Sequence, residues 1–338
     1  MKYLSEIKIV SNTNNKTDNE EQSFEKYSSN KGNVISDENL LVVNSPNDLC
    51  NFLKEEALNH KEFHHYTTFE SLKLLLTNKT FKMTRGISHK LNDLHEPKEK
   101  GEYDTWERTY MSCFNYSDEE NMAMWGLYGR PSNEAVRITI PKDTFIKLCK
   151  SNCKVLSNDE IIDNNIIDIF ATDIFYTKCN NKKRDKDPAF QEHNGRKIKF
   201  KIKEKLFNYL KNAEFTGCVK SHSWHYEDEV RIIARLKKGY VYSDDFILLN
   251  IPEECLKTFK ITTGPNFTKK EELYRLLRPL KIKSTYSLLE NMINFKNFFE
   301  LAEPSIDRFI KGLKHDYLGF NDNTQSLVDK FIEELKIF

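Results

Sequence analysis

The stretch SWHYEDEVRI, residues 223–232, sets three acidic residues between aromatic side chains and a β-branched run. If residues 226–233 form a strand, successive side chains point to opposite faces, so Glu227, Glu229 and Arg231 share one face. The two carboxylates would then lie about 6.6–7 Å apart, with room for a substrate hydroxyl or ring between them. Like charges raise the pKa of at least one carboxyl, and Arg231 offsets that repulsion. The stretch therefore predicts a strand that presents a carboxylate pair.

Two other interpretations of this stretch stay open from the residues alone. A solvated strand face with a simple Glu–Arg pair has the same alternation. In a helix, Glu227 and Arg231 would be i,i+4 partners. The β-branched side chains of Val230, Ile232 and Ile233 favour the strand over the helix.

The composition of the chain is that of a globular protein. Its 338 residues are 38% hydrophobic, which is enough for one large core or two smaller ones. The 52 Lys and Arg residues nearly balance the 51 Asp and Glu residues, so any attraction to nucleic acid must be local. The seven cysteines are scattered without a C-x-x-C pair, and no apolar run reaches about 18–20 residues. These features predict a cytoplasmic protein that does not bind a membrane.

Hydrophobic periodicity predicts an α+β fold in which helices and strands are interleaved. Helices are expected over 45–58 and 69–79, with strands over 62–67 and 80–84 between and after them. A basic helix is expected over 188–213.

The same pattern divides the chain into three regions. Residues 1–44 are rich in polar residues and are expected to form a mobile N-terminal arm. Residues 45–267 are expected to form a catalytic domain that carries a basic insertion at 178–205, and residues 268–338 a helical C-terminal region.

Five short motifs in a fixed order resemble a large, mostly uncharacterised bacterial family with an ADP-ribosyltransferase-like fold. The resemblance covers roughly residues 62–265. The motifs are HHYT (64–67), LNDLHE (91–96), SCF (112–114), MWGLYG (124–129) and the W-x-Y-E-x-E-x-R pattern of the opening stretch.

The resemblance implies a core of two small antiparallel sheets with flanking helices, and NAD bound as a substrate between them. It makes Glu229 the catalytic carboxylate and Glu227 its companion two residues earlier. Thr84 departs from the tyrosine usual at its motif position. The residues that the resemblance assigns to NAD are His65, Tyr66, Thr67, Thr84, Asn92, Asp93 and Trp125.

Several of these assignments have an equally good structural interpretation. Tyr66 and Trp125 either stack on nicotinamide or adenine, or belong to the core. Asn92 and Asp93 either bind a ribose or are turn residues. His64 is expected to be the exposed neighbour of His65 rather than a ligand.

The expected chemistry suits a carboxylate pair. Cleavage of the bond between nicotinamide and ribose develops positive charge on the sugar, as glycoside cleavage does. A carboxylate bonded to the ribose 2′-hydroxyl stabilises that charge, and a second carboxylate can orient or deprotonate the nucleophile. The spacing of Cys218, His222 and His225 is not that of a standard zinc site, so no metal is expected.

The segment 178–205 is the strongest local charge in the chain. It holds 11 Lys and Arg residues against four Asp and Glu residues. Such a segment is either a solvated basic face or a surface for a phosphate backbone. The candidates for nucleic-acid contact are Lys197, Lys199 and Lys201.

We therefore expect an NAD-dependent ADP-ribosyltransferase. The resemblance further implies a bacterial toxin or anti-phage effector. The basic segment makes nucleic acid the expected target, RNA before DNA, and the apolar C-terminal helices either pack on the core or offer a face to an antitoxin or chaperone. A protein acceptor, NAD hydrolysis, and a non-catalytic NAD or nucleic-acid sensor are the alternatives.

Overall fold

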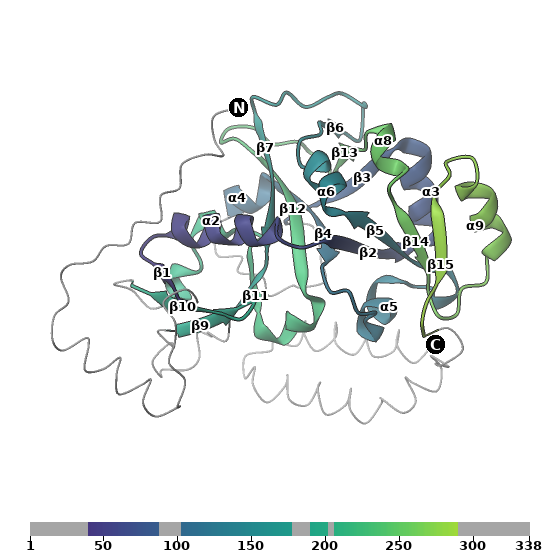
Figure 1. Cartoon of the computed structure of the whole chain (residues 1–338). Coiled ribbons are helices and arrows are strands. Elements are labelled where there is room, and N and C mark those ends of the chain that lie inside the picture. The colour runs from purple at the N-terminus through teal and green to yellow at the C-terminus, as the bar shows by residue number, and fades with distance from the viewer. Residues whose placement is uncertain (1–39, 88–102, 178–189, 202–205, 290–338) are drawn as a thin grey trace, which may run out of the picture.

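The computed structural model describes residues 40–87, 103–177, 190–201 and 206–289 (Figure 1). Most of the expected N-terminal arm, the candidates Asn92 and Asp93, and the helices expected after residue 289 lie outside the described residues. In the described part the fold is a mixed α+β structure, as predicted. No helix there is long and apolar enough to cross a membrane.

A branched ten-stranded ladder forms the centre of the molecule. Its main path runs β15-β14-β5-β2-β4-β3-β13-β6, and β12 and β7 branch from β4. All of its pairings are antiparallel except that of β14 with β15. The strands are β2 (Glu62–Thr68), β3 (Thr80–Arg85), β4 (Thr109–Asn115), β5 (Ala135–Pro141), β6 (Cys153–Val155), β7 (Ile167–Asp173), β12 (Glu229–Leu236), β13 (Phe246–Asn250), β14 (Lys260–Thr263) and β15 (Lys283–Tyr286).

Strand β4 is the junction of the ladder. One of its edges pairs with β12 from Thr109 to Asn115. Its other edge is divided, because Met111 pairs with Thr84 of β3 whereas Asn115 pairs with His64 of β2. The two sheets that were expected as separate are therefore two arms of one ladder that diverge at β4.

Apolar side chains lie on both faces of the ladder, and helices cover them. One cluster includes Phe63, Phe114 and Val230 and is closed by α3 (Phe69–Asn78), α6 (Lys142–Leu148) and α8 (Glu253–Leu256). A second cluster on the opposite face joins Met111 and Ile233 to α2 (Pro46–Ala57). The helix α2 begins where the sequence predicts, because Ser45 and Asp48 form a capping box and Pro46 occupies the first turn. The remaining helices are α4 (Tyr103–Glu107), α5 (Met122–Tyr128), α7 (Leu206–Tyr209), α9 (Lys270–Leu277) and the 3₁₀ turns η2 (Ser132–Glu134), η3 (Ala213–Phe215) and η4 (His222–Glu227).

The basic helix predicted over 188–213 is wrong. Residues 190–200 form a hairpin of β9 (Phe190–His193) and β10 (Arg196–Phe200), to which β1 (Leu40–Val43) adds parallel to β10, and within the described part of the segment only α7 is α-helical. Asn194 and Gly195 form the turn with φ of 48° and 76°. Both values are positive, as a two-residue hairpin turn between twisted strands requires, and Asn-Gly is the commonest pair there.

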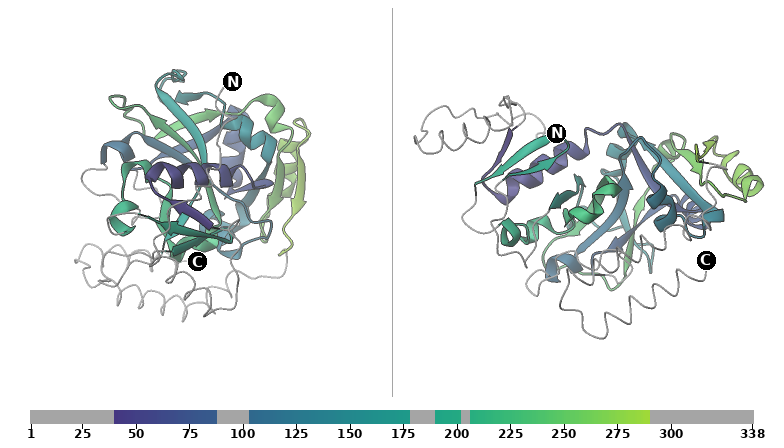
Figure 2. Two further views of the ribbon diagram at one scale, coloured as in Figure 1. Left: turned by 60° about the vertical axis from the view of Figure 1, so that its left-hand side comes forward. Right: turned by 90° about the horizontal axis from the view of Figure 1, so that it is seen from below.

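The region after residue 267 is not helical throughout. Helix α9 is followed by the strand β15, which extends the ladder beside β14. Leu273, Leu277 and Ile282 are buried in the first apolar cluster, so α9 and the residues up to Ile282 pack on the core, whereas β15 is exposed. The sheet of β1, β10 and β9 lies at the opposite end of the molecule from α9 (Figures 1 and 2). A further pair, β8 (Phe175–Thr177) with β11 (Val219–Ser221), runs parallel.

The central position of β12 makes its apolar side chains the most sensitive part of the core. Ile232 is fully buried between Ser112 and Ala171 on the neighbouring strands. We expect Ile232→Ala to lower the free energy of unfolding by about 2–5 kcal/mol in urea denaturation. Leu74→Ala, at an exposed position of α3, should cost less than about 0.5 kcal/mol. Equal costs at both positions would contradict the central placement of β12.

Candidate active site

The acidic stretch enters β12 through a tight turn. Residues His222–Glu227 form η4, and Asp228 adopts the left-handed conformation with φ of 39°. Asp tolerates this conformation better than most residues. The strand predicted from residue 226 therefore begins at Glu229, and Glu227 lies in the turn before it.

A single ammonium group joins the two carboxylates. Lys220 Nζ lies 2.6 Å from Glu227 Oε2 and 2.7 Å from Glu229 Oε2. The exposed fractions of the three residues are 5%, 1% and 3%. The predicted space for a substrate between the carboxylates is thus occupied by Lys220, because the turn brings Glu227 back toward Glu229.

Arg231 holds Glu229 from within the strand. Its Nε donates to Glu229 Oε1 at 2.6 Å and its Nη2 to Oε2 at 3.3 Å. Its Nη1 donates to the carbonyl of Gly217 at 3.0 Å. The predicted Glu–Arg pair therefore exists, but it is buried rather than solvated.

Glu227 is held by a different set of donors. Tyr128, at the end of α5, donates its hydroxyl to Glu227 Oε1 at 2.6 Å. Asn115 of β4 donates its side-chain amide to the Glu227 carbonyl at 2.6 Å. Asn121 caps α5 and donates to the Tyr226 carbonyl at 2.7 Å. Helix α5 is thereby attached to the turn that carries Glu227.

The two carboxyls have opposite proton affinities. Burial raises the pKa of Glu229, but Arg231 and Lys220 more than offset it, so its pKa lies well below the usual range. Burial and the adjacent charge of Glu229 raise the pKa of Glu227, although Lys220 opposes them. Glu229 is therefore a permanent anion, and Glu227 is the carboxyl that more readily accepts a proton.

Strand register decides which residues share a face with the carboxylates. Residues paired directly across a ladder point to the same side. Asn115 pairs with both Glu229 and His64, so His64 and, two residues on, Tyr66 lie on the carboxylate face. The expectation that His64 is exposed is wrong, since it is 3% exposed.

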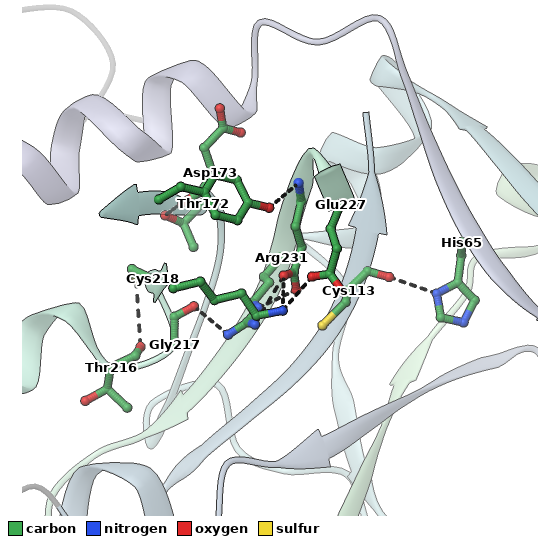
Figure 3. A network of polar contacts seen from close by, with 12 residues as sticks. His65, Cys113, Thr172, Asp173, Thr216, Gly217, Cys218, Glu227 and Arg231 are labelled. Atoms are coloured by element: carbon green, nitrogen blue, oxygen red, sulfur yellow. Dashed lines mark hydrogen bonds and ion pairs between the residues drawn. The ribbon is translucent and has the colours of Figure 1, made fainter. Parts of the chain in front are cut away.

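His65 and Thr67 lie on the opposite face of β2. The His65 ring packs near Phe81 and Phe114 of the first apolar cluster. Its Nδ1 lies 2.9 Å from the Cys113 carbonyl (Figure 3), which can only accept, so Nδ1 carries the proton. The structure thus separates the predicted NAD ligands His65 and Thr67 from Glu229.

Tyr66 and Trp125 are on the carboxylate face but are packed against each other. Their rings meet edge to face with centroids 4.8 Å apart, and both side chains are buried. Thr84 is not near this group. Its partner on β4 is Met111, about 13 Å along the strand from Asn115.

Three residues of this site were missed by the sequence analysis. Lys220 lies in a short strand with no charge pattern that indicates its role. Tyr128 lies inside the MWGLYG motif, which was a usable signal. Arg137 interrupts the apolar run of β5, and its guanidinium lies beside Tyr66 with Nη1 3.4 Å from the Tyr66 hydroxyl.

The three candidate lysines for nucleic-acid contact share one face because the chain is extended there, not helical as predicted. Residues 197 and 199 of β10, and residue 201 directly after it, follow a period of two and share one face, whereas Ile198 and Phe200 are buried on the other. A helix would have scattered them. No three His, Cys, Asp or Glu side chains in the described ranges converge as metal ligands.

Comparison with known protein families finds a similarity over part of the chain, to a family of unknown function. Residues 124–232 match a family described as "Protein of unknown function (DUF2971)". The matched segment ends within β12 and includes Tyr128, Arg137, Lys220 and both glutamates. No curated protein matches the chain, and no solved structure matches it.

The two glutamates should differ in what they contribute to stability. Glu229→Gln leaves Arg231 buried without its carboxylate, and we expect a loss of about 3–5 kcal/mol in unfolding free energy at pH 7. Because the pKa of Glu229 is lowered in the fold, its stabilisation is present above the unfolded value near 4.5 and is lost as the pH falls below it. The difference in unfolding free energy between Glu229→Gln and wild type should therefore become smaller at acidic pH.

Glu227→Gln is the matched control for this measurement. The raised pKa of Glu227 means that its ionisation costs stability as the pH rises above about 4.5. We expect this variant to unfold at a urea concentration much closer to that of wild type. If Glu227→Gln lowers the unfolding free energy more than Glu229→Gln does, then Glu227 and not Glu229 is the stabilising anion.

Proposed function

We propose that the protein is an NAD-dependent ADP-ribosyltransferase with Glu227 and Glu229 at its reacting centre. The observation that carries the proposal is that two carboxylates share Lys220 while their pKa values are shifted in opposite directions. Paired acids with opposed shifts are typical of sites that need one permanent anion and one proton acceptor.

The division of labour follows from the contacts of each carboxylate. In the proposed reaction the bond between ribose C1′ and nicotinamide breaks, nicotinamide leaves, and the acceptor oxygen or nitrogen bonds to C1′. Glu229, kept ionised by Arg231, stabilises the positive charge that develops on the sugar. Glu227 accepts the proton that the acceptor loses. Tyr128 keeps the Glu227 carboxylate in place for this step.

The site must open before it can react. Glu227, Glu229 and Lys220 are all buried. Displacement of the Lys220 side chain is the smallest change that would expose both carboxylates, since Lys220 lies between them. The resulting loss of the ammonium would raise the pKa of Glu227 further and so make it a better base.

A nucleic-acid acceptor is the version of the proposal that the charge distribution favours. The lysines of β10 form a basic strand face, and a flexible polyanion binds to such faces through its phosphates. The cellular role of toxin or anti-phage effector rests on the family resemblance described above and on no residue.

The burial of Glu229 favours one second candidate. A carboxylate that is almost fully occupied by Arg231 and Lys220 also suits a non-catalytic sensor, in which the ion pairs only shape a ligand site. Turnover separates the two candidates, because a sensor would bind NAD without cleaving it.

The proposal is tested by incubating the protein with radiolabelled NAD and separate pools of RNA, DNA and cell protein. We expect label in the RNA pool, and a loss of at least a hundredfold in rate with Glu227→Gln, because removal of a general base costs about 10²–10⁴. Glu119→Gln, at an exposed site beside α5, is the control and should retain the wild-type rate. Label in the protein pool would identify a protein acceptor, and release of nicotinamide without label would identify water as the acceptor. If neither label nor free nicotinamide appears, the transferase proposal fails and the non-catalytic sensor is the remaining candidate.

The lysines of β10 give a second test. Replacement of Lys197, Lys199 and Lys201 by Glu should weaken binding to single-stranded RNA and reduce the slope of log affinity against log salt by about 2. Lys237, Lys238 and Lys257 are exposed lysines elsewhere, and the same replacement there should leave the slope nearly unchanged. Equal effects of the two triple variants would rule out a specific role for β10.

A further inference from the structure

Arg137 is a buried cation that has no carboxylate partner among the described residues. It lies at the middle of β5, opposite Tyr66 of β2, and is 9% exposed. Within the described residues, its Nε has no hydrogen-bond partner and no acidic side chain forms an ion pair with it. A buried charge in this condition costs several kcal/mol unless something compensates it.

A second unpartnered polar atom among the described residues lies on the same face. His64 accepts or donates at Nδ1 with the Thr139 hydroxyl at 2.9 Å, and its buried Nε2 has no partner. Burial and the charge of Arg137 lower the pKa of His64 to about 4, so the ring is neutral at pH 7. Buried polar atoms of this kind need an explanation, and a missing ligand or ion is one.

The neighbouring carboxylates are committed to other partners. Glu62 binds Lys260 at 2.7 Å and Glu134 binds Lys269 at 2.8 Å. Glu120 accepts from the Trp125 indole at 3.1 Å. Asp118 and Glu62 act on His64 only through longer-range charge, which opposes the lowering of its pKa, and no described acid forms an ion pair with Arg137.

We propose that Arg137, His64 and Tyr66 bind the diphosphate of a nucleotide. The planar guanidinium can donate two parallel hydrogen bonds to phosphate oxygens. When Nδ1 of His64 accepts from the Thr139 hydroxyl, Nε2 carries the proton, so it and the Tyr66 hydroxyl supply further donors from the adjacent strand. The inference deepens the proposed function, since NAD carries a diphosphate, but it requires binding only and not catalysis.

The site lies on the carboxylate face at a position that suits this role. Tyr66 accepts from Arg137 and from the backbone N–H of Asn121, both at 3.4 Å, and Asn121 holds the turn that carries Glu227. A diphosphate on Arg137 would thus occupy the β2–β5 side of the face, with the carboxylates on the β12 side.

The test measures the binding of ADP, inorganic pyrophosphate and adenosine by titration calorimetry. We expect wild type to bind ADP and pyrophosphate, and to bind adenosine at least tenfold more weakly than ADP. Arg137→Met should weaken ADP binding about ten- to a hundredfold, the loss expected for charge-assisted hydrogen bonds. Arg275→Met, at an exposed position of α9, removes the same charge elsewhere and should leave binding unchanged.

Two further measurements separate a ligand site from a structural arginine. Arg137→Met should keep or raise the melting temperature of the free protein, because it removes an uncompensated buried charge. In wild type, bound ADP should raise the pKa of His64 in an NMR titration, because an adjacent anion favours the imidazolium.

The outcomes are distinct from those of the transferase test. If wild type binds neither ADP nor pyrophosphate, or if Arg137→Met lowers the melting temperature and leaves ADP binding intact, the inference is overturned. If ADP binding depends on Arg137 but no label is transferred from NAD, the diphosphate site stands and the transferase fails.

Discussion

The ion pair between Arg231 and Glu229 is the constraint on which the candidate site depends. Both residues lie at the start of the central strand, where water cannot compensate a charge. Each remaining polar atom must therefore find a partner: Gly217 accepts from the guanidinium, and Lys220 approaches the carboxylate. The position of Lys220 in turn brings Glu227 into the network. One buried pair thus determines the approach of β11, the turn η4 and, through Tyr128, the end of α5.

The alternation of β-strands separates packing from chemistry within the same segments. In β2, Phe63 and His65 face the first apolar cluster, whereas His64 and Tyr66 face the carboxylates. The branching of the ladder at β4 brings β2 and β12 to the two edges of one strand, although about 160 residues lie between them in the sequence. Register along β4 therefore decides which residues can meet a common ligand.

Local pattern predicted the elements whose signals are local. The capping box at Ser45 and the β-branched run after Glu229 gave a helix and a strand at nearly the observed bounds. The helix predicted over 188–213 rested on the lysine content of the segment. The Asn194–Gly195 pair is a stronger signal, and it indicates a hairpin. The error at Glu227 has a different origin, because a single left-handed residue at Asp228 ends the extended chain and leaves almost no pattern in the sequence.

By itself, the sequence determined the α+β class, the central acidic stretch and the presence of a Glu–Arg pair, because these depend on residue type and short-range spacing. Only the tertiary structure decided that Lys220 joins the two glutamates, that His64 rather than His65 shares their face, and that Arg137 lies buried with no ion-pair partner in the described ranges. These facts depend on strand register and on contacts between distant segments. A pKa follows from the charges and burial around a group, so the different roles of Glu227 and Glu229 emerge only after folding.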